Sequence, residues 1–445
     1  MHVRISGVRN VELQANKPIG FWGCWALVVG CMIGSGIFML PAQLAPYGML
    51  GLVGLIVAGA GAIALALVFA RQAERTKCDG GPYAYSRQAF GDLTGFLMGW
   101  AYWLSFVAGV PTVAMAFVSY LGVFVPGLAT NPLGQMASGI ALIAAFTFIN
   151  IRGLKEMSVT QITLTVLKII PLVAIIAFAI PAGAPANAPA FNPSGQSIFA
   201  ALTLTALIAL WPFTGFEVVT LPAGNVKDCE RTIPRALITG MLTVVVIYLS
   251  ATVAVMLLVP PAQLMHSTAP FSDAARALGP WGPGLIAAGA LVATAGTING
   301  LIFTCGQMPL AVAADKLAPS WLAAMSKHGT PHLALYVSSA LGIVLLVLTN
   351  TRGLMGSFQF MLTIATSLGL FYYVVVSLAE LRHSARAAAF AGVGASIIGI
   401  AYSVFAAFGS GAEVLLWCIV LMATGVPLYF VFKRGGAAAA PNPTS

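Results

Sequence analysis

The first apolar segment of the chain is interrupted by the run Gly30-Cys-Met-Ile-Gly34-Ser-Gly36-Ile-Phe-Met-Leu-Pro41. Glycine lowers helix stability and proline removes a backbone donor, so this segment is expected to unwind and expose peptide N–H and C=O groups. A second run, Trp211-Pro-Phe-Thr-Gly215-Phe-Glu217, breaks a later apolar segment in the same way. In hydrocarbon, such groups are tolerated only where they line a cavity enclosed by protein. Two interrupted segments at corresponding places in two halves of a membrane protein indicate the binding site of a transporter.

The composition is that of an integral membrane protein. Of 445 residues, 59% are hydrophobic and 7% are charged, and the mean hydropathy is +0.94. About 20 apolar residues cross the bilayer core, and the sequence predicts twelve such spans joined by short polar segments, with no separate soluble domain. The first span lacks a small-residue cleavage site and is expected to be a retained helix. The predicted spans cover residues 19–44, 48–74, 96–122, 133–151, 158–181, 197–223, 234–260, 282–312, 332–349, 357–380, 387–409 and 412–432.

The net charge of +9 reflects topology rather than binding to nucleic acid. With the amino terminus placed in the cytoplasm, all but three of the 21 Lys and Arg residues fall on the cytoplasmic side. Arg276 and Arg352 fall on the opposite side, and Lys168 lies within a span. This bias satisfies the positive-inside rule. The sequence therefore predicts a multi-pass protein of the cell (inner or plasma) membrane, with both termini cytoplasmic and the lipid bilayer as its surroundings.

The order of the spans predicts an inverted repeat. Two sets of five spans, residues 19–181 and 197–380, each begin with an interrupted helix, and an odd number of spans gives the second set the opposite orientation. Residues 1–18 are expected to form a cytoplasmic amino terminus, and residues 433–445 a disordered cytoplasmic tail. The last two helices, within 387–432, carry no obvious intramembrane chemistry, and we expect them to be peripheral and candidates for a homodimer contact.

Four motifs resemble the amino acid–polyamine–organocation superfamily of transporters. They are Gly34–Phe38 (Gly-Ser-Gly-Ile-Phe), Gly80–Tyr85 (Gly-Gly-Pro-Tyr-Ala-Tyr), Gly215–Glu217 (Gly-Phe-Glu) and Gly296–Gly300 (Gly-Thr-Ile-Asn-Gly), in the order and spacing of that family. The likeness extends over roughly residues 19–435 and includes the arginine/agmatine antiporter branch and the light subunits of heteromeric amino-acid exchangers. It implies an all-α leucine-transporter fold, with a 5+5 inverted repeat, broken helices 1 and 6 and two peripheral helices, and alternating-access transport of amino acids or their amine products.

The two breaks suggest how a substrate's backbone groups would be held. A half-helix that follows an unwound segment offers free N–H groups and a positive dipole end to a carboxylate. We expect the Ser35 hydroxyl and the Gly36 N–H to bind that carboxylate, and the carbonyls of Met32, Trp211 and Thr214 to accept the α-ammonium. The alternative is that the glycines serve only close helix packing. The predicted substrate-binding residues are Met32, Ile33, Gly34, Ser35, Gly36, Phe106, Val110, Trp211, Pro212, Phe213, Thr214, Leu301 and Ala365.

Two charged residues lie deep within predicted spans and are expected to act in gating or coupling. A lysine at the centre of a span, such as Lys168, costs about 2.5–3.5 kcal/mol on insertion scales, so we expect it to have a function. The alternative is a lysine that is merely tolerated among the helices. Family members with a lysine here imply that its ammonium replaces a sodium ion, although the arginine/agmatine antiporter lacks it. For Glu217, resemblance implies a gate with Tyr102 and Tyr373, and a structural hydrogen-bond acceptor is an equal alternative.

The predicted side-chain pocket is more apolar than that of the arginine/agmatine antiporter. Leu301 takes the place of a tryptophan, which removes a cation–π contact of about 0.5–2 kcal/mol, and Val110 and Ala365 replace polar residues. This favours neutral side chains, unless Glu217 reaches the side chain and turns the site toward cations. The alternative is that Val110 and Leu301 serve only packing.

The leading hypothesis is therefore a sodium-independent secondary transporter, an exchanger of neutral L-amino acids. The alternatives are a cationic amino acid/amine antiporter of the arginine/agmatine type, a proton-coupled symporter and an amino-acid sensor. No nucleophile–base pair or metal-ligand cluster indicates an enzyme, no P-loop indicates ATP-driven transport, and no cofactor is expected. The six cysteines show no paired spacing, so neither a disulfide framework nor a zinc site is predicted.

Overall fold

A computed structural model describes residues 19–76, 80–152, 157–221 and 226–438. All regular elements of these residues are helices, and Ile19 and Val226 form an isolated bridge. The predicted terminal segment 1–18 and most of the tail 433–445 lie outside the described residues. The helices are α1 (Phe21–Met32), α2 (Ser35–Leu44), α3 (Met49–Arg75), α4 (Gly81–Phe90), α5 (Asp92–Leu121), α6 (Pro132–Arg152), α7 (Met157–Ala182), α8 (Ile198–Phe213), α9 (Cys229–Leu258), α10 (Pro261–Leu264), α11 (Pro270–Ala274), α12 (Gly282–Ala314), α13 (His332–Thr349), α14 (Gly353–Arg386), α15 (Phe390–Phe408) and α16 (Gly411–Ala438). Short 3₁₀ turns are η1 (Ala45–Tyr47), η2 (Pro126–Leu128), η3 (Pro185–Asn187), η4 (Phe216–Thr220), η6 (Ala275–Leu278), η7 (Ser320–Ala323) and η8 (Asn350–Arg352).

The apolar helices are those of a multi-span membrane protein. Among the described residues, nine helices are long and apolar enough to cross a membrane, and α1 with α2, bent by 40° at their junction, brings the number to ten. Two shorter apolar helices, Thr165–Ala179 within α7 and α8, occupy two further predicted spans. Each predicted span overlaps a helix or a helix pair, while the exact count of twelve stays a prediction.

Both predicted breaks are present and have local causes. Helix α1 ends at Met32, Ile33 is extended, and α2 restarts at Ser35 after Gly34, whereas Pro41 lies inside α2 without ending it. Helix α8 ends at Phe213, after which Gly215 adopts a φ of +96° before η4 begins. A left-handed residue at this position favours glycine, which has no Cβ to clash with the backbone.

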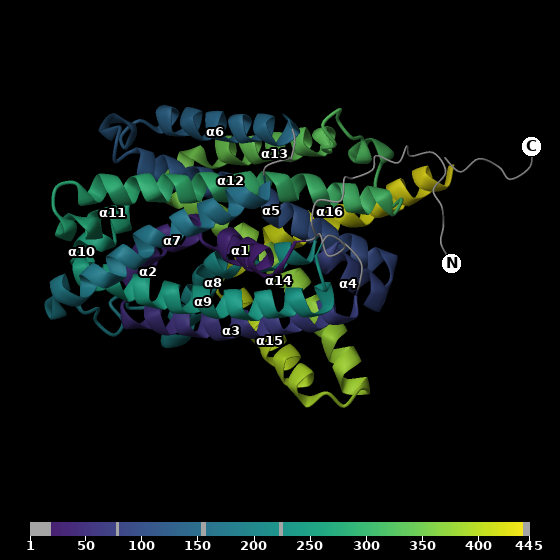
Figure 1. Ribbon diagram of the computed structural model, residues 1–445, viewed down its shortest axis with the longest axis horizontal. Coiled ribbons are helices and arrows are strands. Elements are labelled where there is room, and N and C mark those ends of the chain that lie inside the picture. The colour runs from purple at the N-terminus through teal and green to yellow at the C-terminus, as the bar shows by residue number, and fades with distance from the viewer. Residues whose placement is uncertain (1–18, 77–79, 153–156, 222–225, 439–445) are drawn as a thin grey trace, which may run out of the picture.

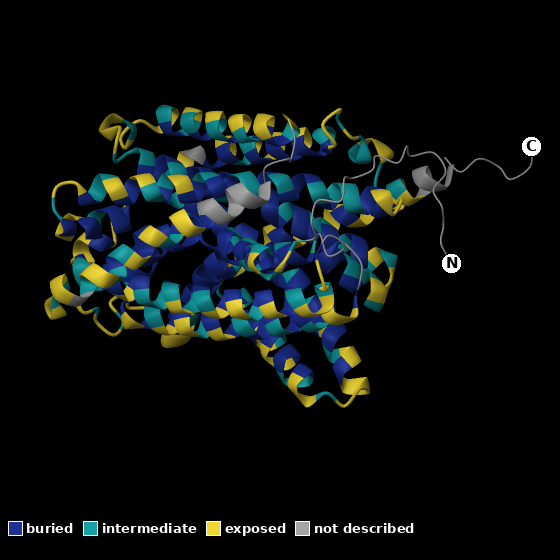
Figure 2. Ribbon diagram, in the orientation of Figure 1, coloured by how far each residue is buried: buried dark blue, intermediate teal, exposed yellow. Residues whose placement is uncertain are grey.

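Helices α5 and α14 form the centre of the bundle. They pack on each other, α12 lies against α5, and α3 packs on α8, α9 and α15. Of the residues in the most apolar stretches of α5 and α14, 83% and 78% are buried, against 22% in α6 and in α16, which therefore lie at the periphery of the bundle. Figure 2 shows the same contrast, with exposed stripes on the outer helices and a buried centre. The predicted peripheral position agrees with α16 more closely than with α15, which packs on α3, α8 and α14.

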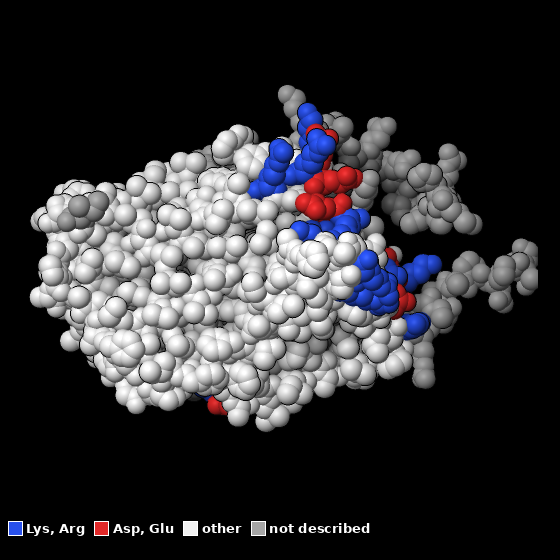
Figure 3. Space-filling view, turned by 90° about the horizontal axis from the view of Figure 1, so that it is seen from below, with Lys and Arg blue, Asp and Glu red and all other residues white. Residues whose placement is uncertain are grey.

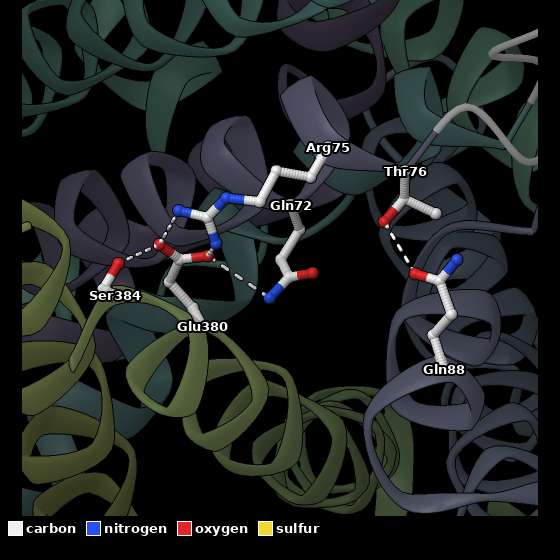
Figure 4. Close-up of polar contacts among 6 residues, drawn as sticks. All are labelled: Gln72, Arg75, Thr76, Gln88, Glu380 and Ser384. Carbon is white, nitrogen blue, oxygen red and sulfur yellow. Dashed lines mark hydrogen bonds and ion pairs between the residues drawn. The ribbon is translucent and has the colours of Figure 1, made fainter. Parts of the chain in front are cut away.

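Charged side chains gather toward one end of the molecule, as the visible face in Figure 3 shows. At this end the Arg75 guanidinium contacts both carboxylate oxygens of Glu380, at 2.6 and 3.0 Å (Figure 4). Ser384 donates to the same carboxylate at 2.5 Å, and Gln72 donates at 3.3 Å. Glu380 is fully buried, so this cluster fastens α3 to α14 through a satisfied charge.

Candidate functional site

Two glycines of the first break approach neighbouring helices closely: Gly36 approaches Pro212 of the second broken helix, and Gly34 approaches Thr297 of α12. A Cβ placed on Gly36 would lie 2.7 Å from Pro212 Cα, and one placed on Gly34 would lie 2.3 Å from Thr297 Oγ1. Contacts this short require glycine at both positions. These glycines therefore permit close helix packing, and both residues also line a cavity.

That cavity lies between α1, α2, α5, α8, α12 and α14 and has a volume of about 50 Å³. One water needs roughly 10–15 Å³ of such space, so this conformation has room for a few waters and must widen to admit an amino acid. The lining residues are Gly30, Cys31, Met32, Gly34, Ser35, Gly36, Ser105, Phe106, Trp211, Pro212, Thr214, Gly215, Val218, Gly296, Thr297, Gly300, Leu301, Thr304 and Tyr372.

Four residues predicted to bind substrate do not line the cavity: Ile33, Val110, Phe213 and Ala365. Val110 faces α13, where a Cβ on Gly342 would lie 3.4 Å from it, so the packing interpretation of Val110 is correct. The Ala365 carbonyl accepts a hydrogen bond from the Ser105 hydroxyl at 2.7 Å. The Phe213 ring packs on Tyr248, with centroids 5.2 Å apart. Of the three positions on which the neutral preference rested, only Leu301 reaches the cavity.

Two of the three carbonyls expected to accept an α-ammonium, those of Trp211 and Met32, already have donors. The Trp211 carbonyl accepts from the Thr214 N–H at 3.0 Å and from its hydroxyl at 2.7 Å. The Met32 carbonyl accepts from the Tyr248 hydroxyl at 2.6 Å, and that phenol also lies 3.2 Å from the Pro212 carbonyl. Tyr248, on α9, thus fastens both breaks. The sequence offered one signal for it, a phenol within a long apolar helix.

The Lys168 side chain is fully buried and crosses from α7 to the first break. Its ammonium donates to the Gly30 carbonyl at 2.9 Å and lies 3.2 Å from Thr297 Oγ1. The Thr297 hydroxyl is also 3.4 Å from the Ile33 carbonyl. A single positive charge therefore joins the unwound part of the first helix to α12, the place at which the family resemblance implied a lysine.

Glu217 receives its hydrogen bonds from α14 and from its own turn. Its carboxylate accepts from the Tyr372 hydroxyl at 2.9 Å, from the Tyr373 hydroxyl at 3.3 and 3.4 Å, and from the Gly215 N–H at 3.1 Å. The Tyr102 hydroxyl has no hydrogen-bond partner in the part of the chain that the structure describes, so its place in a gate with Glu217 stays a prediction. The Tyr102 ring instead packs edge-on against the ring of Tyr372, with centroids 5.2 Å apart.

Sequence reasoning included Leu301 of α12 in the site but missed Thr297, Thr304 and Tyr372. Thr297, Leu301 and Thr304 follow one another at spacings of four and three, which places them on one face of a helix. The motif Gly296–Gly300 had been singled out for its resemblance only, and its periodicity could have identified this face. Tyr372 had no such signal, because Tyr373 is its neighbour and rotation of α14 decides which phenol lines the cavity.

Most of the Gly80–Tyr85 motif lies in helix α4, which connects α3 to α5. Its Tyr83 hydroxyl donates to Asp315 at 2.7 Å, and Arg87 joins Asp315 at 2.7 Å and Asp92 at 2.8 Å. Burial, and then the hydrogen bond to Asp315, raise the pKa of Tyr83 above its usual range, so the phenol is a neutral donor. This cluster ties α4 to the end of α12.

No metal site is found among the described residues, where no three His, Cys, Asp or Glu side chains converge. Five cysteines are free thiols, Cys24, Cys31, Cys229, Cys305 and Cys418, and Cys78 lies outside the described residues.

The fold and site define a helical, multi-span membrane protein with a central cavity between two broken helices. Residues 19–431 match the amino acid permease family model, and the chain belongs to that family, within the amino acid–polyamine–organocation superfamily. It is 31% identical over 378 residues to a cadaverine/lysine antiporter of Escherichia coli K12, covering 82% of this chain and 84% of the relative. It is 28% identical over 449 residues to an arginine/ornithine antiporter of Pseudomonas aeruginosa, covering 95% and 92%. The protein is therefore a membrane transporter, not an enzyme, and it resembles the basic amino acid antiporter branch of the superfamily.

Proposed function

We propose that the protein is a sodium-independent antiporter that exchanges a basic amino acid for a second cationic amino acid or diamine by alternating access. The observation that carries this proposal is likeness along most of the chain to two antiporters named for lysine, cadaverine, arginine and ornithine. The neutral preference expected from the sequence lacks this support. It also rested on Val110 and Ala365, which lie away from the cavity.

The polar side of the cavity is consistent with a cationic side chain. Tyr372 lines the cavity and donates to Glu217 at 2.9 Å, so one phenol separates the cavity from a fully buried carboxylate. Trp211 and Phe106 add aromatic rings to the lining. A desolvated cation needs a matched carboxylate or an aromatic face. In this arrangement Glu217 would favour substrates with a cationic side chain.

The backbone groups of the substrate would meet the first break. Ser35 and Gly36 form the first turn of α2 and line the cavity, so their N–H groups and the Ser35 hydroxyl are available to a carboxylate. The carbonyls of Met32 and Thr214 remain our candidates for the α-ammonium. A carbonyl has two lone pairs, so Met32 can accept a second donor beside Tyr248.

Lys168 supports the absence of a sodium requirement. Its ammonium occupies the space between the Gly30 carbonyl and Thr297, where a bound cation would otherwise neutralise the exposed carbonyl groups. With Glu217 and Tyr373, it forms the proposed coupling machinery, and it couples the conformations of the first break and α12.

The topology completes the proposal. Residues 19–181 and 197–380 would be two inverted five-helix repeats, followed by two further helices in 387–432, twelve spans in all. Both termini would be cytoplasmic in an inner or plasma membrane, since the charged end of the molecule would face the cytoplasm. The exposed apolar face of α16 is our candidate for a homodimer contact.

Counterflow in proteoliposomes tests the function. Vesicles loaded with lysine should accumulate labelled lysine, and external arginine, ornithine or cadaverine should compete better than alanine or leucine, in sodium and in choline buffers alike. Stronger competition by alanine or leucine would restore the neutral hypothesis. Uptake into vesicles with no internal substrate, driven by a pH gradient, would favour a proton symporter. Binding without any flux would indicate a sensor.

A further inference from the structure

A second cavity lies at the end of the molecule that carries α10 and α11, opposite α4 (Figure 1). Its volume is about 350 Å³, compared with about 50 Å³ for the central cavity. Small-molecule sites are typically about 300–1,000 Å³, so this cavity has room for an amino acid or a diamine. Polar lining comes from several elements, and includes Ser119, Thr130, Gln135, Thr268 and Asp273.

Asp273 supplies a negative charge to this cavity. Among the described lining residues it is the one with an ionisable side chain, and that side chain is 20% exposed. The Ser267 hydroxyl donates to Oδ2 at 2.5 Å and fixes the carboxylate, while Oδ1 has a long contact of 3.3 Å with Arg276. The Arg276 side chain is 71% exposed. Exposed ion pairs contribute little because water competes for both partners, so an ammonium group can take the place of Arg276 at Oδ1.

The helix that carries Asp273 also closes the bundle at this end. The Phe271 ring, two residues earlier on α11, packs on Phe38 of α2 with centroids 5.3 Å apart. The Tyr120 hydroxyl donates to the Phe38 carbonyl at 2.7 Å and accepts from the Phe271 N–H at 3.4 Å. A ligand at Asp273 therefore sits beside the aromatic plug that separates the outer end from the first broken helix.

We propose that Asp273 and this cavity form an outer loading site for the ammonium group of a basic amino acid or diamine. The proposal rests on the proposed function and on the outward orientation of α11. The carboxylate attracts the cationic group before the Phe271 plug opens, and the surrounding hydroxyl and amide groups solvate the rest of the molecule. The ammonium group of the substrate must displace Arg276 from Asp273 Oδ1, so binding at this site is weak. The site therefore raises the local concentration of substrate rather than storing it.

The test compares the two faces of the membrane. Lysine uptake by whole cells measures the outer face, and uptake by everted vesicles measures the cytoplasmic face. Asp273→Asn should raise the outer KM for lysine about fivefold or more, since a hydrogen bond to a charged group is lost, and should leave the cytoplasmic KM within twofold. Arg276→Gln, which removes the competing guanidinium, should lower the outer KM.

Glu413→Gln is the matched control, because Glu413 is an exposed carboxylate at the same end that pairs with Arg352 at 3.5 Å. It should change neither KM. An outer KM unchanged in both Asp273→Asn and Arg276→Gln would overturn the loading site alone, as would equal changes on both faces. If Asp273→Asn fails to reach the membrane, the Arg276→Gln result decides. A parent protein that takes up no basic amino acid would overturn the proposed function and the loading site with it.

Discussion

Gly36→Ala adds one methyl group where the two broken helices are closest. The new Cβ would lie 2.7 Å from Pro212 Cα and 2.8 Å from Pro212 Cβ, whereas ordinary contacts begin at 3.4 Å. The opposing atoms belong to the backbone or to a rigid ring, so no rotamer change relieves the clash. The half-helices would have to separate by roughly 0.7 Å in a close-packed interior. Overpacking of this kind costs about 1–3 kcal/mol, which would weaken substrate binding roughly 5- to 150-fold if all of it appears in binding.

Two other glycines provide matched controls for this methyl group. Gly394, on α15, has no atom within 4 Å of its added Cβ, and neither has Gly300, which lines the cavity. Gly394→Ala should leave binding at the parent value and raise stability by at most about 1 kcal/mol through helix propensity, and Gly300→Ala should affect binding only through the volume that the methyl group occupies. Equilibrium binding of labelled lysine to purified protein, with a melting curve for each variant, gives both quantities. Gly36→Ala that binds lysine within twofold of the parent would refute the close approach of the two breaks.

Three further substitutions test the buried charges. Lys168→Met should slow lysine exchange at least about tenfold, because a buried ammonium that bridges two helices is lost. Exchange by the parent protein should be equal in sodium and choline, and sodium dependence would contradict this role. Tyr372→Phe removes the 2.9 Å hydrogen bond to Glu217 and should weaken lysine binding by about 1–3 kcal/mol. The inhibition constant should rise more for lysine than for leucine, and equal changes would argue against a cation near this phenol. Breaking a fully buried ion pair costs roughly 3–5 kcal/mol of stability, and Glu380→Gln should cost less because the Arg75 side chain is 35% exposed. An unchanged melting temperature would show that the pair does not hold α3 and α14 together.

The sequence predicted the helices and their interruptions well, because both depend on local properties. A run of apolar residues sets the length of a helix, and the prediction 332–349 coincides with α13 while 282–312 differs from α12 by two residues. Glycine acts on its own backbone, so the breaks at Gly34 and Gly215 have a local cause, whereas Pro41 and Pro212 lie inside helices that continue past them. The residues around both breaks were likewise predicted to form the site, and most of them line the cavity.

The tertiary structure decided which face of each helix meets the cavity. Neighbouring residues of a helix point about 100° apart, so a small rotation exchanges their roles: Gly109 lies under Trp211 while Val110 packs on α13, and Tyr372 lines the cavity. That rotation is fixed by packing against segments far away in the chain, as the contacts of Tyr248 with both breaks illustrate. Sequence by itself determined where the chain spans and breaks, since those preferences are local. The side chains that enclose the site depend on the packing of the whole bundle.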